Sequence, residues 1–351
     1  MFLLTADEKK YYTGTWTTAA QAMANMIHYT DKKLDLVDIM GYTGLTFMIN
    51  IHEETVDITG PTASFDWGST FARGMNNLGF KCKYVGTITS PPVAPTLEEV
   101  EAGLALAQKS IDRGIPVMAW DLFVPEFGVI YGSDDDAQTL HCKDVVKDDD
   151  LPYTKLGHGQ IGELFVFGIE SSFEANKNDS LRDTLEMIID HARVPITRLD
   201  GKPFRNGIAG YHAWRKAFEA RTVEDLGNSY NSGVVSDARE YAAEFLRRVS
   251  AEWKEAPAFG SEFSVLSLAA SEHYHKAANA LVKMREMFPM WQGGEPNKPE
   301  HAEIAISLLE TAQVEEEQGV QKLEQMLAIM EASSGQISTR AQNKTYPAKK
   351  S

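Results

Sequence analysis

The hydrophobic residues of this 351-residue chain change their spacing near residue 175, and no other feature constrains the fold as strongly. Before about residue 172, short apolar runs separated by turn residues alternate with helical patterns. After about residue 178, the apolar residues recur with the spacing of amphipathic helices. The sequence therefore predicts an α+β domain over residues 1–175, an all-α domain over residues 178–332 and a polar tail over residues 333–351.

The first part begins with one helix and continues mainly with strands. Ala19, Met23 and Ile27 recur at helical spacing and predict a helix over residues 16–30 with one buried face. A second helix, over residues 97–113, begins with a capping-box pattern and ends at a glycine. Strands are expected over residues 80–88, 115–120, 127–131, 139–142 and 163–169. This order is typical of a mostly antiparallel sheet in an α+β fold.

The second part predicts a helical bundle. Apolar residues at helical spacing indicate one helix that Pro195 ends, a second around Trp214 and a third from Ala238 to Trp253. Two long helices follow over residues 262–288 and 300–332.

Composition excludes several classes of function. The formal net charge is −16, which argues against a nucleic-acid-binding face and against docking on an anionic membrane. No apolar run reaches the roughly 20 residues of a transmembrane helix, and the four apolar residues that begin the chain are too few for a signal peptide. The two cysteines, Cys82 and Cys142, are expected in mid-strand, which suits a reducing compartment. We therefore expect a cytoplasmic protein without a membrane or nucleic-acid partner.

The start of the first helix is the first candidate for chemistry. The segment Gly14-Thr15-Trp16-Thr17-Thr18 lies where a helix N-terminus stabilises negative charge, and nucleophiles are often placed there. The alternative is that Thr15 or Thr17 only caps the helix. The sequence does not decide which threonine takes the helix-start position.

Two carboxylates form the second candidate. Glu126 precedes an apolar strand, where a partly buried carboxylate can act as a general base or anchor a ligand. Asp144 follows the returning strand, where it can orient a partner on the neighbouring strand. The alternatives are an exposed glutamate at a strand end and a loop aspartate without a catalytic role.

Metal binding is not predicted. His52, Glu53 and Glu54 are adjacent, and adjacent strand residues point to opposite faces, so the three cannot converge on one ion. The run Glu315–Glu317 is interpreted as a solvated helix face. No phosphate-binding glycine loop or nucleophile-elbow pattern occurs, and no cofactor is expected.

A helix start with Gly14 and Trp16, followed by strands and a hairpin that begins Glu126-Phe127-Gly128, resembles the papain-like fold of the bacteriocin-processing peptidases. In that family the corresponding hairpin begins with the catalytic histidine and returns to an aspartate. The resemblance places Thr15 near the position of the catalytic cysteine, Glu126 at the histidine position and Asp144 at the aspartate position.

The longer pattern is similar to the bacterial family around butirosin biosynthesis protein H, in which a papain-like domain precedes a helical domain. The pieces that carry this similarity are Met40–Gly44 with Phe47, the Glu126 hairpin, Leu151–Tyr153, Gly210-Tyr211 with Trp214, Ala238-Arg239 with Phe245, and Met287–Pro289. The resemblance implies an acyl- or aminoacyl-transferase, or an amide-processing enzyme, of bacterial small-molecule biosynthesis. Its acyl substrate would be a small molecule or be bound to a carrier protein.

In this hypothesis Thr15 is the nucleophile or oxyanion donor, Glu126 the base and Asp144 the orienting residue. Four further residues are expected to bind substrate: Trp16, Thr17, Trp120 and Asp121. The alternatives are a catalytically inactive relative that binds a small molecule or peptide, and a scaffold that forms a homodimer through its C-terminal helices.

Overall fold

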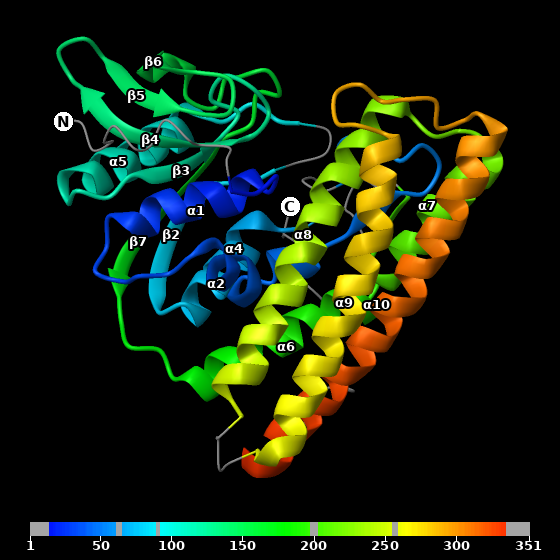
Figure 1. The fold of residues 1–351 in the computed structure, drawn as a ribbon. Helices are drawn as coiled ribbons and strands as arrows, with labels where there is room; N and C mark the ends of the chain where they lie inside the picture. The colour runs from blue at the N-terminus through cyan, green and yellow to red at the C-terminus, as the bar shows by residue number, and fades with distance from the viewer. Residues whose placement is uncertain (1–13, 61–64, 89–91, 197–202, 255–258, 335–351) are drawn as a thin grey trace.

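The computed structural model describes residues 14–60, 65–88, 92–196, 203–254 and 259–334. The chain is α+β and 57% helical, with a six-stranded antiparallel sheet and a helical C-terminal region. Figure 1 shows the sheet on one side of the molecule and the long helices α8, α9 and α10 side by side on the other. The expected α+β class and the helical second part are therefore confirmed. The expected polar tail beyond residue 334 and the first four residues lie outside the described ranges.

The main sheet has the strand order β2-β7-β3-β4-β5-β6, and each neighbouring pair is antiparallel. Its strands are β2 (Phe80–Gly86), β3 (Val117–Trp120), β4 (Phe127–Asp134), β5 (Thr139–Lys143), β6 (Asp148–Pro152) and β7 (Phe165–Ser172). Five of them were predicted. The sixth, β6, was missed because a strand that begins with three aspartates has no apolar alternation.

Both faces of this sheet are covered. Along β3, Met118 and Trp120 pack into one hydrophobic cluster, whereas Val117 and Ala119 pack into another. The first cluster includes α1 (Thr18–His28) and α4 (Trp67–Asn77), and the second includes α5 (Leu97–Asp112). A strand buried on both faces is continuously apolar, which explains the unbroken run at β3.

Capping explains where two of the helices begin. Thr96 and Glu99 form the predicted capping box of α5, and Gly114 follows that helix with a φ of +82°. Asp35 and Asp38 form a second capping box, at α2 (Leu36–Tyr42). The sequence analysis missed α2 because its seven residues are too few for a helical period to stand out.

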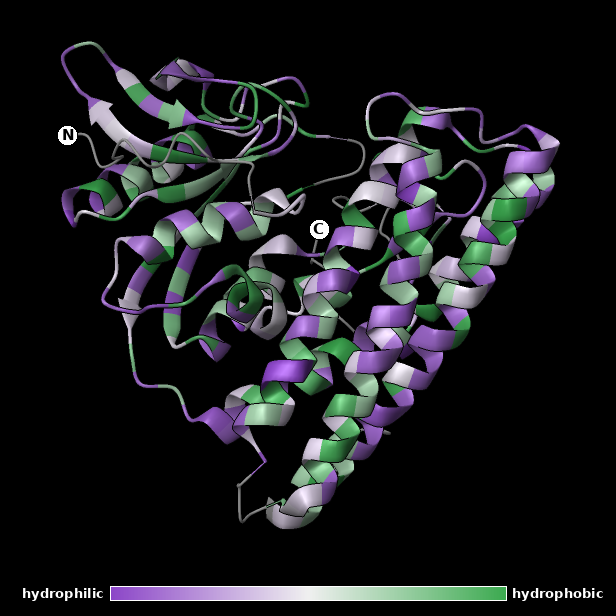
Figure 2. Cartoon of the chain, viewed as in Figure 1, coloured by the Kyte–Doolittle hydropathy of each residue, from purple (hydrophilic) through white to green (hydrophobic). Residues whose placement is uncertain are grey.

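After β7, the described part of the chain forms five helices and one short strand. They are α6 (Lys177–Arg193), β8 (Phe204–Asn206), α7 (Ile208–Ala220), α8 (Asp225–Glu252), α9 (Gly260–Met287) and α10 (Pro299–Ser334). In Figure 2 the three long helices carry hydrophilic and hydrophobic residues in alternating patches, as expected for amphipathic helices.

The two parts of the chain share cores and a sheet. Strand β1 (Asn50–His52) pairs antiparallel with β8, across the expected boundary near residue 175. Phe47, in the short helix η2 (Leu45–Phe47), packs in one cluster with Phe245 of α8 and Tyr274 of α9. The helical part is therefore packed directly against the segment that precedes α4.

Two local expectations were wrong. The alternation of Phe80, Cys82 and Tyr84 with two lysines predicts that Tyr84 faces the core from β2. Its side chain is instead 43% exposed, because β2 is the edge strand and its register shifts at Lys81/Cys82. The run Glu315–Glu317 was interpreted as a solvated face. Glu316 is instead fully buried, and Glu315 and Glu317 pair with His273 and Arg193.

No helix within the described ranges has both the length and the apolar character that crossing a bilayer requires.

Candidate functional site

A buried glutamate joins the first helix, the sheet and the bundle. Oε2 of Glu126 accepts a 2.7 Å hydrogen bond from the hydroxyl of Thr18, the first residue of α1. Oε1 accepts a 2.6 Å bond from the hydroxyl of Tyr230 in α8. The Thr18 hydroxyl also accepts a 3.3 Å bond from the backbone N–H of Phe127, where β4 begins. Three segments far apart in sequence thus meet at one carboxyl group.

The surroundings of Glu126 change its pKa. Burial raises the pKa of this carboxyl, while the hydrogen bonds from Tyr230 and Thr18 oppose the shift and the nearby charge of Asp144 adds to it. A carboxyl with a raised pKa is a stronger base once it has lost its proton. The expected alternative, an exposed strand-end glutamate, is excluded because Glu126 is buried.

Thr15 does not take part in this contact. Its hydroxyl donates a 2.5 Å hydrogen bond to Oδ2 of Asp237 in α8, and the same oxygen accepts from the N–H of Trp16 at 3.0 Å. Burial raises the pKa of Asp237 to about 6, against the effect of these two hydrogen bonds. Thr15 therefore anchors the segment before α1 to the bundle, and the threonine beside Glu126 is Thr18.

Thr17 is the N-cap residue of α1, but its side chain makes no capping hydrogen bond. Its backbone N–H donates to the hydroxyl of Thr15 at 3.1 Å. Among the described residues, the N-cap side chain therefore leaves the N–H groups of the first turn of α1 without a capping acceptor. The first backbone N–H groups of a helix lack partners within the helix, so this end of α1 can stabilise a negative charge placed near it.

Asp144 is committed to the backbone of two loops. Oδ2 accepts from the N–H groups of Phe123 and Val124 at 3.0 and 3.2 Å, and Oδ1 accepts from those of Val146 and Lys147 at 2.9 and 3.2 Å. Asp144 was expected to orient a side chain of the site, but these contacts are all with backbone N–H groups. A carboxylate cannot donate to Glu126, so Asp144 fixes the loop that carries Glu126 instead.

Asp121 and Trp120 do not lie on the pocket described below, contrary to the expectation. Asp121 has a φ of +56°, and its carboxylate accepts from the N–H groups of residues 160–162. Trp120 packs against Trp67 and Phe127, with ring centroids 4.8 and 5.0 Å away. Asp121 therefore orders a loop, and Trp120 belongs to the core under the site.

A narrow apolar pocket adjoins Thr18 and Tyr230. The centre of a water molecule can occupy a volume of about 50 Å³ inside this pocket. Trp16 and Thr17 line it as expected, together with aromatic and aliphatic side chains of the α4, β4 and α8 segments. The lining residues are Trp16, Thr17, Thr18, Ala19, Leu45, Met48, Ile49, Asn50, Phe65, Trp67, Phe71, Phe127, Tyr230, Val234, Val235 and Ala238. A volume of this size suits a short acyl chain rather than a large ligand.

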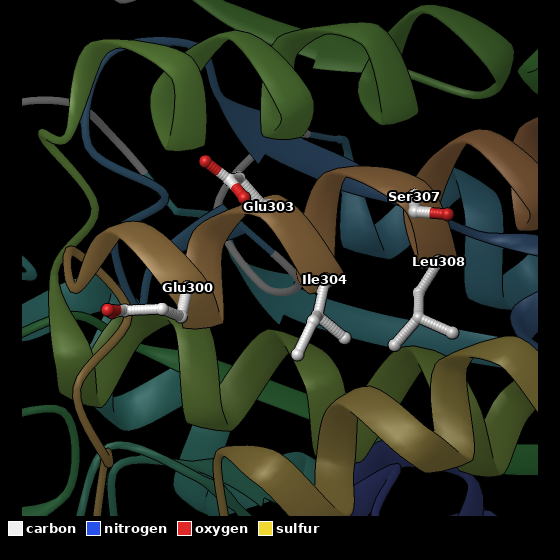
Figure 3. A pocket seen from close by; sticks show the side chains of 5 residues that line it. All are labelled: Glu300, Glu303, Ile304, Ser307 and Leu308. Carbon is white, nitrogen blue, oxygen red and sulfur yellow. The ribbon is translucent and has the colours of Figure 1, made fainter.

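A second hollow lies on the first turns of α10 (Figure 3). Ile304 and Leu308 project from one side of the helix, and Glu303 and Ser307 from the other. Ile304 is 51% exposed. This hollow is an open surface without a buried polar group among its lining residues, so it offers less chemistry than the first pocket.

Metal-ligand clusters of three or more His, Cys, Asp or Glu side chains are absent from the described residues. Two of the three residues considered for metal binding have other partners: Glu53 pairs with Arg205, and His52 Nδ1 contacts Thr55. The cysteines are in mid-strand as predicted, and burial raises the pKa of Cys82 to about 12. Neither cysteine is activated as a nucleophile, because burial raises the pKa of Cys142 as well.

Four residues of this site have no role in the prediction from sequence. Thr18 could have been predicted from the sequence, because the Thr15–Thr18 segment contains three threonines and the last one falls on the first helical turn. Tyr230 and Asp237 belong to a helix more than 200 residues downstream of the helix-start threonines, and no local pattern links them to that segment. Asn50 has no spacing signal in the sequence.

A search against protein-family models and a search against curated protein sequences each gave no match for this chain.

Proposed function

We propose that this protein is an acyl-transferring or amide-processing enzyme in which the Thr18 hydroxyl is the reacting group and Glu126 the base. The observation that carries the proposal is the 2.7 Å hydrogen bond between the Thr18 hydroxyl and a buried carboxyl of raised pKa. A nucleophile within hydrogen-bond reach of its base, with a third group holding the base, is the arrangement that nucleophilic catalysis requires. Tyr230 would hold Glu126 in place.

The reaction would proceed in two transfers. Glu126 takes the Thr18 proton while the oxygen attacks the carbonyl carbon of an ester, thioester or amide. The bond to the leaving alcohol, thiol or amine then breaks, and Glu126 returns the proton to that group. Water or an acceptor amine next attacks the acyl-threonine and loses its proton to Glu126. The bond between the acyl carbon and the Thr18 oxygen then breaks, and Glu126 returns the proton to Thr18. The N-terminus of α1, whose residues 17–19 line the pocket, is suited to stabilise the oxyanion.

The proposal includes a papain-like relationship for the α+β part and a role in bacterial small-molecule biosynthesis. Placing Thr18 rather than Thr15 at the nucleophile position keeps the pairing with Glu126 that the resemblance implies. The acyl donor would be a small molecule or a carrier-protein conjugate in the cytoplasm. A homodimer through α9 and α10 would bury three apolar side chains that are exposed in the isolated chain: Val265, Leu268 and Val314.

A second candidate is a pocket that binds an acyl group without reacting. One observation favours it: both oxygens of Glu126 already accept a hydroxyl hydrogen bond, and Thr18 also accepts from Phe127. A fully satisfied network holds its members in place and costs free energy to open. The threonine hydroxyl is also a weak nucleophile compared with a thiolate.

Incubation with p-nitrophenyl butyrate, followed by intact-mass measurement and peptide mapping, separates these candidates. The enzyme proposal expects a burst of nitrophenolate and one butyryl group on the peptide that contains Thr18. Thr18→Val should remove the adduct, Thr18→Ser should retain it, and Thr17→Val is the matched control because Thr17 lines the same pocket. An adduct that persists in Thr18→Val, or no adduct in the wild type, would contradict the enzyme proposal.

A further inference from the structure

The segment that precedes α1 forms a strap (residues 14–17) along the apolar pocket. Trp16 and Thr17 of the strap line the pocket. Among the described residues that line it, Trp16 alone is exposed, with 39% of its surface open to solvent. Trp67 and Phe127, which also line the pocket, are almost fully buried. Trp16 therefore lies between the pocket and solvent.

The strap is held by side chains of α8. Oδ2 of Asp237 accepts the hydroxyl hydrogen of Thr15 at 2.5 Å and the N–H of Trp16 at 3.0 Å. The hydroxyl of Tyr241 donates to the carbonyl oxygen of Gly14 at 2.5 Å. Asp237 and Tyr241 are four residues apart, so they lie on the same face of α8, one turn apart. These hydrogen bonds fasten the strap to a helix that itself lines the pocket.

The strap has few buried side chains of its own. Gly14 and Trp16 are exposed, and Thr15 is the one buried residue of the four. The side chain of Thr17 makes no capping hydrogen bond to α1. A segment with few buried contacts opens more readily than the core, so we expect the bonds to Asp237 to set how often the strap leaves α8.

We propose that the strap opens and closes the pocket, and that Asp237 holds it closed. While the two bonds to Asp237 are made, Trp16 covers the pocket. When they break, the strap moves off α8 and a ligand can enter. Asp237 binds the strap, so it is a positioning residue. The inference concerns access to the site, and it rests on the proposed function for the nature of the ligand, a short acyl group.

Opening should depend on pH, because it exposes Asp237 to water. The charged and titratable groups that face this carboxyl are Glu240 and Tyr241 of α8 and Arg285 of α9. Burial raises the pKa of Asp237 to about 6, against the two strap bonds; Glu240 adds to the rise and Arg285 opposes it. With the strap open, this pKa returns toward 3.8, so the closed strap binds the proton more tightly. Opening therefore increases as pH rises from about 4 to 6, by up to about 100-fold.

Amide hydrogen exchange in the wild type tests the opening directly. Relative to its intrinsic rate, the N–H of Trp16 should exchange at least about 10-fold faster than that of Met26 in the interior of α1. Low concentrations of urea should not change the rate at Trp16, because a local opening exposes little surface. The protection of Trp16 should fall between about pH 4 and 6, and Asp237→Asn should remove most of this fall. Exchange at Trp16 as slow and as urea-dependent as at Met26 would overturn the inference.

Access to the pocket is measured in a Val235→Cys protein, which has a thiol on the pocket wall. The probe is methyl methanethiosulfonate, a small apolar reagent, and labelling at residue 235 is followed by peptide mapping at one fixed pH. Thr15→Val keeps the shape of the side chain and removes the hydroxyl that binds Asp237. Added to Val235→Cys, it should raise the labelling rate at least about 10-fold.

Glu244→Gln is the matched control on α8, because Glu244 pairs with Arg247 and Arg248. It should leave the labelling rate unchanged. Equal rates with and without Thr15→Val, or no labelling in either protein, would overturn the inference. If Thr15→Val does not fold, the exchange of Trp16 in the wild type still decides.

The labelling test is independent of the acylation test. Faster labelling in Thr15→Val without any butyryl adduct in the wild type would refute the proposed enzyme and leave this inference standing. A butyryl adduct together with unchanged labelling would do the reverse.

Discussion

Arg239 of α8 and Glu316 of α10 form an ion pair in which both side chains are almost completely buried, with 2.7 Å between Nη2 and Oε1. The guanidinium also donates to the carbonyl oxygens of Thr46 and Met48, and Tyr211 donates its hydroxyl to Glu316. The pair thus ties two bundle helices to the loop that leads into β1. That loop carries Met48 and Ile49, which line the pocket.

Removing one partner of this pair should be strongly destabilising. Arg239→Met leaves the Glu316 charge buried and unpaired, and we expect a loss of about 3–5 kcal/mol in the free energy of unfolding. Urea denaturation measures it. The double variant Arg239→Met with Glu316→Leu should recover much of the loss, although the Thr46 and Met48 carbonyls remain without their donor.

The matched control is Arg247→Met, which removes an exposed arginine that pairs with Glu244 one turn away. It should leave the urea midpoint unchanged. If Arg239→Met behaved like this control, the buried pair would not hold the loop in place.

The contribution of Asp237 to the stability of the protein should fall as pH rises from about 4 to 6. The pKa of Asp237 is about 6 in the folded chain, against 3.8 as its ordinary value. The folded state therefore binds the proton more tightly than the unfolded state, and stability is greatest below pH 4 as far as this group is concerned. The loss across this window is on the order of 2–3 kcal/mol.

Glu126 acts in the same direction, because burial raises its pKa too. Asp237→Asn removes only the contribution of Asp237, and it should flatten the dependence of the unfolding free energy on pH between 4 and 6. A slope that Asp237→Asn does not change would show that other groups produce it.

The main elements of the fold could be predicted from local sequence, and most of the site could not. Capping residues and apolar periods reveal α5, α9 and α10 because the forces that define them act within a few residues. Helix α2 and strand β6 are set by packing and pairing with segments elsewhere in the chain, and their own sequences carry too little pattern. Propensity is overridden in such cases by tertiary context.

The site also combines residues that local sequence reveals with residues that only tertiary packing brings together. Glu126 could be found because a carboxylate at the start of an apolar strand stands out in the sequence. Its partner Tyr230 is 104 residues away, on helix α8. Thr15 and Thr18 have the same side chain, and only the packing of α1 against β4 and α8 decides which one reaches Glu126 and which reaches Asp237.

Glu126→Ala should cost about 1–3 kcal/mol of stability, because it leaves the buried hydroxyls of Thr18 and Tyr230 without their acceptor. Glu126→Gln keeps one acceptor oxygen and removes the ionisable group, so we expect a clearly smaller loss. Thermal and urea unfolding at pH 7 compare the two variants. Equal losses would mean that the hydrogen bonds to the two hydroxyls contribute little.

Asp144 should act on the site through the backbone. Its carboxylate accepts four N–H groups, two from the loop that ends at Glu126 and two from residues 146 and 147. Asp144→Ala leaves these groups without their acceptor, and we expect a loss of about 1–3 kcal/mol. The amides of Phe123 and Val124 should exchange their hydrogens faster, because the loop loses its main restraint.

Asp149→Ala is the control for this experiment, since Asp149 is an exposed aspartate of β6 that pairs with Lys147. It should leave the exchange at residues 123 and 124 unchanged. If Asp144→Ala abolished butyryl transfer while leaving stability and exchange unchanged, Asp144 would act on the reaction directly, as the resemblance implied. Faster exchange with a parallel loss of activity would instead assign Asp144 to positioning Glu126, which is the role that its four hydrogen bonds support.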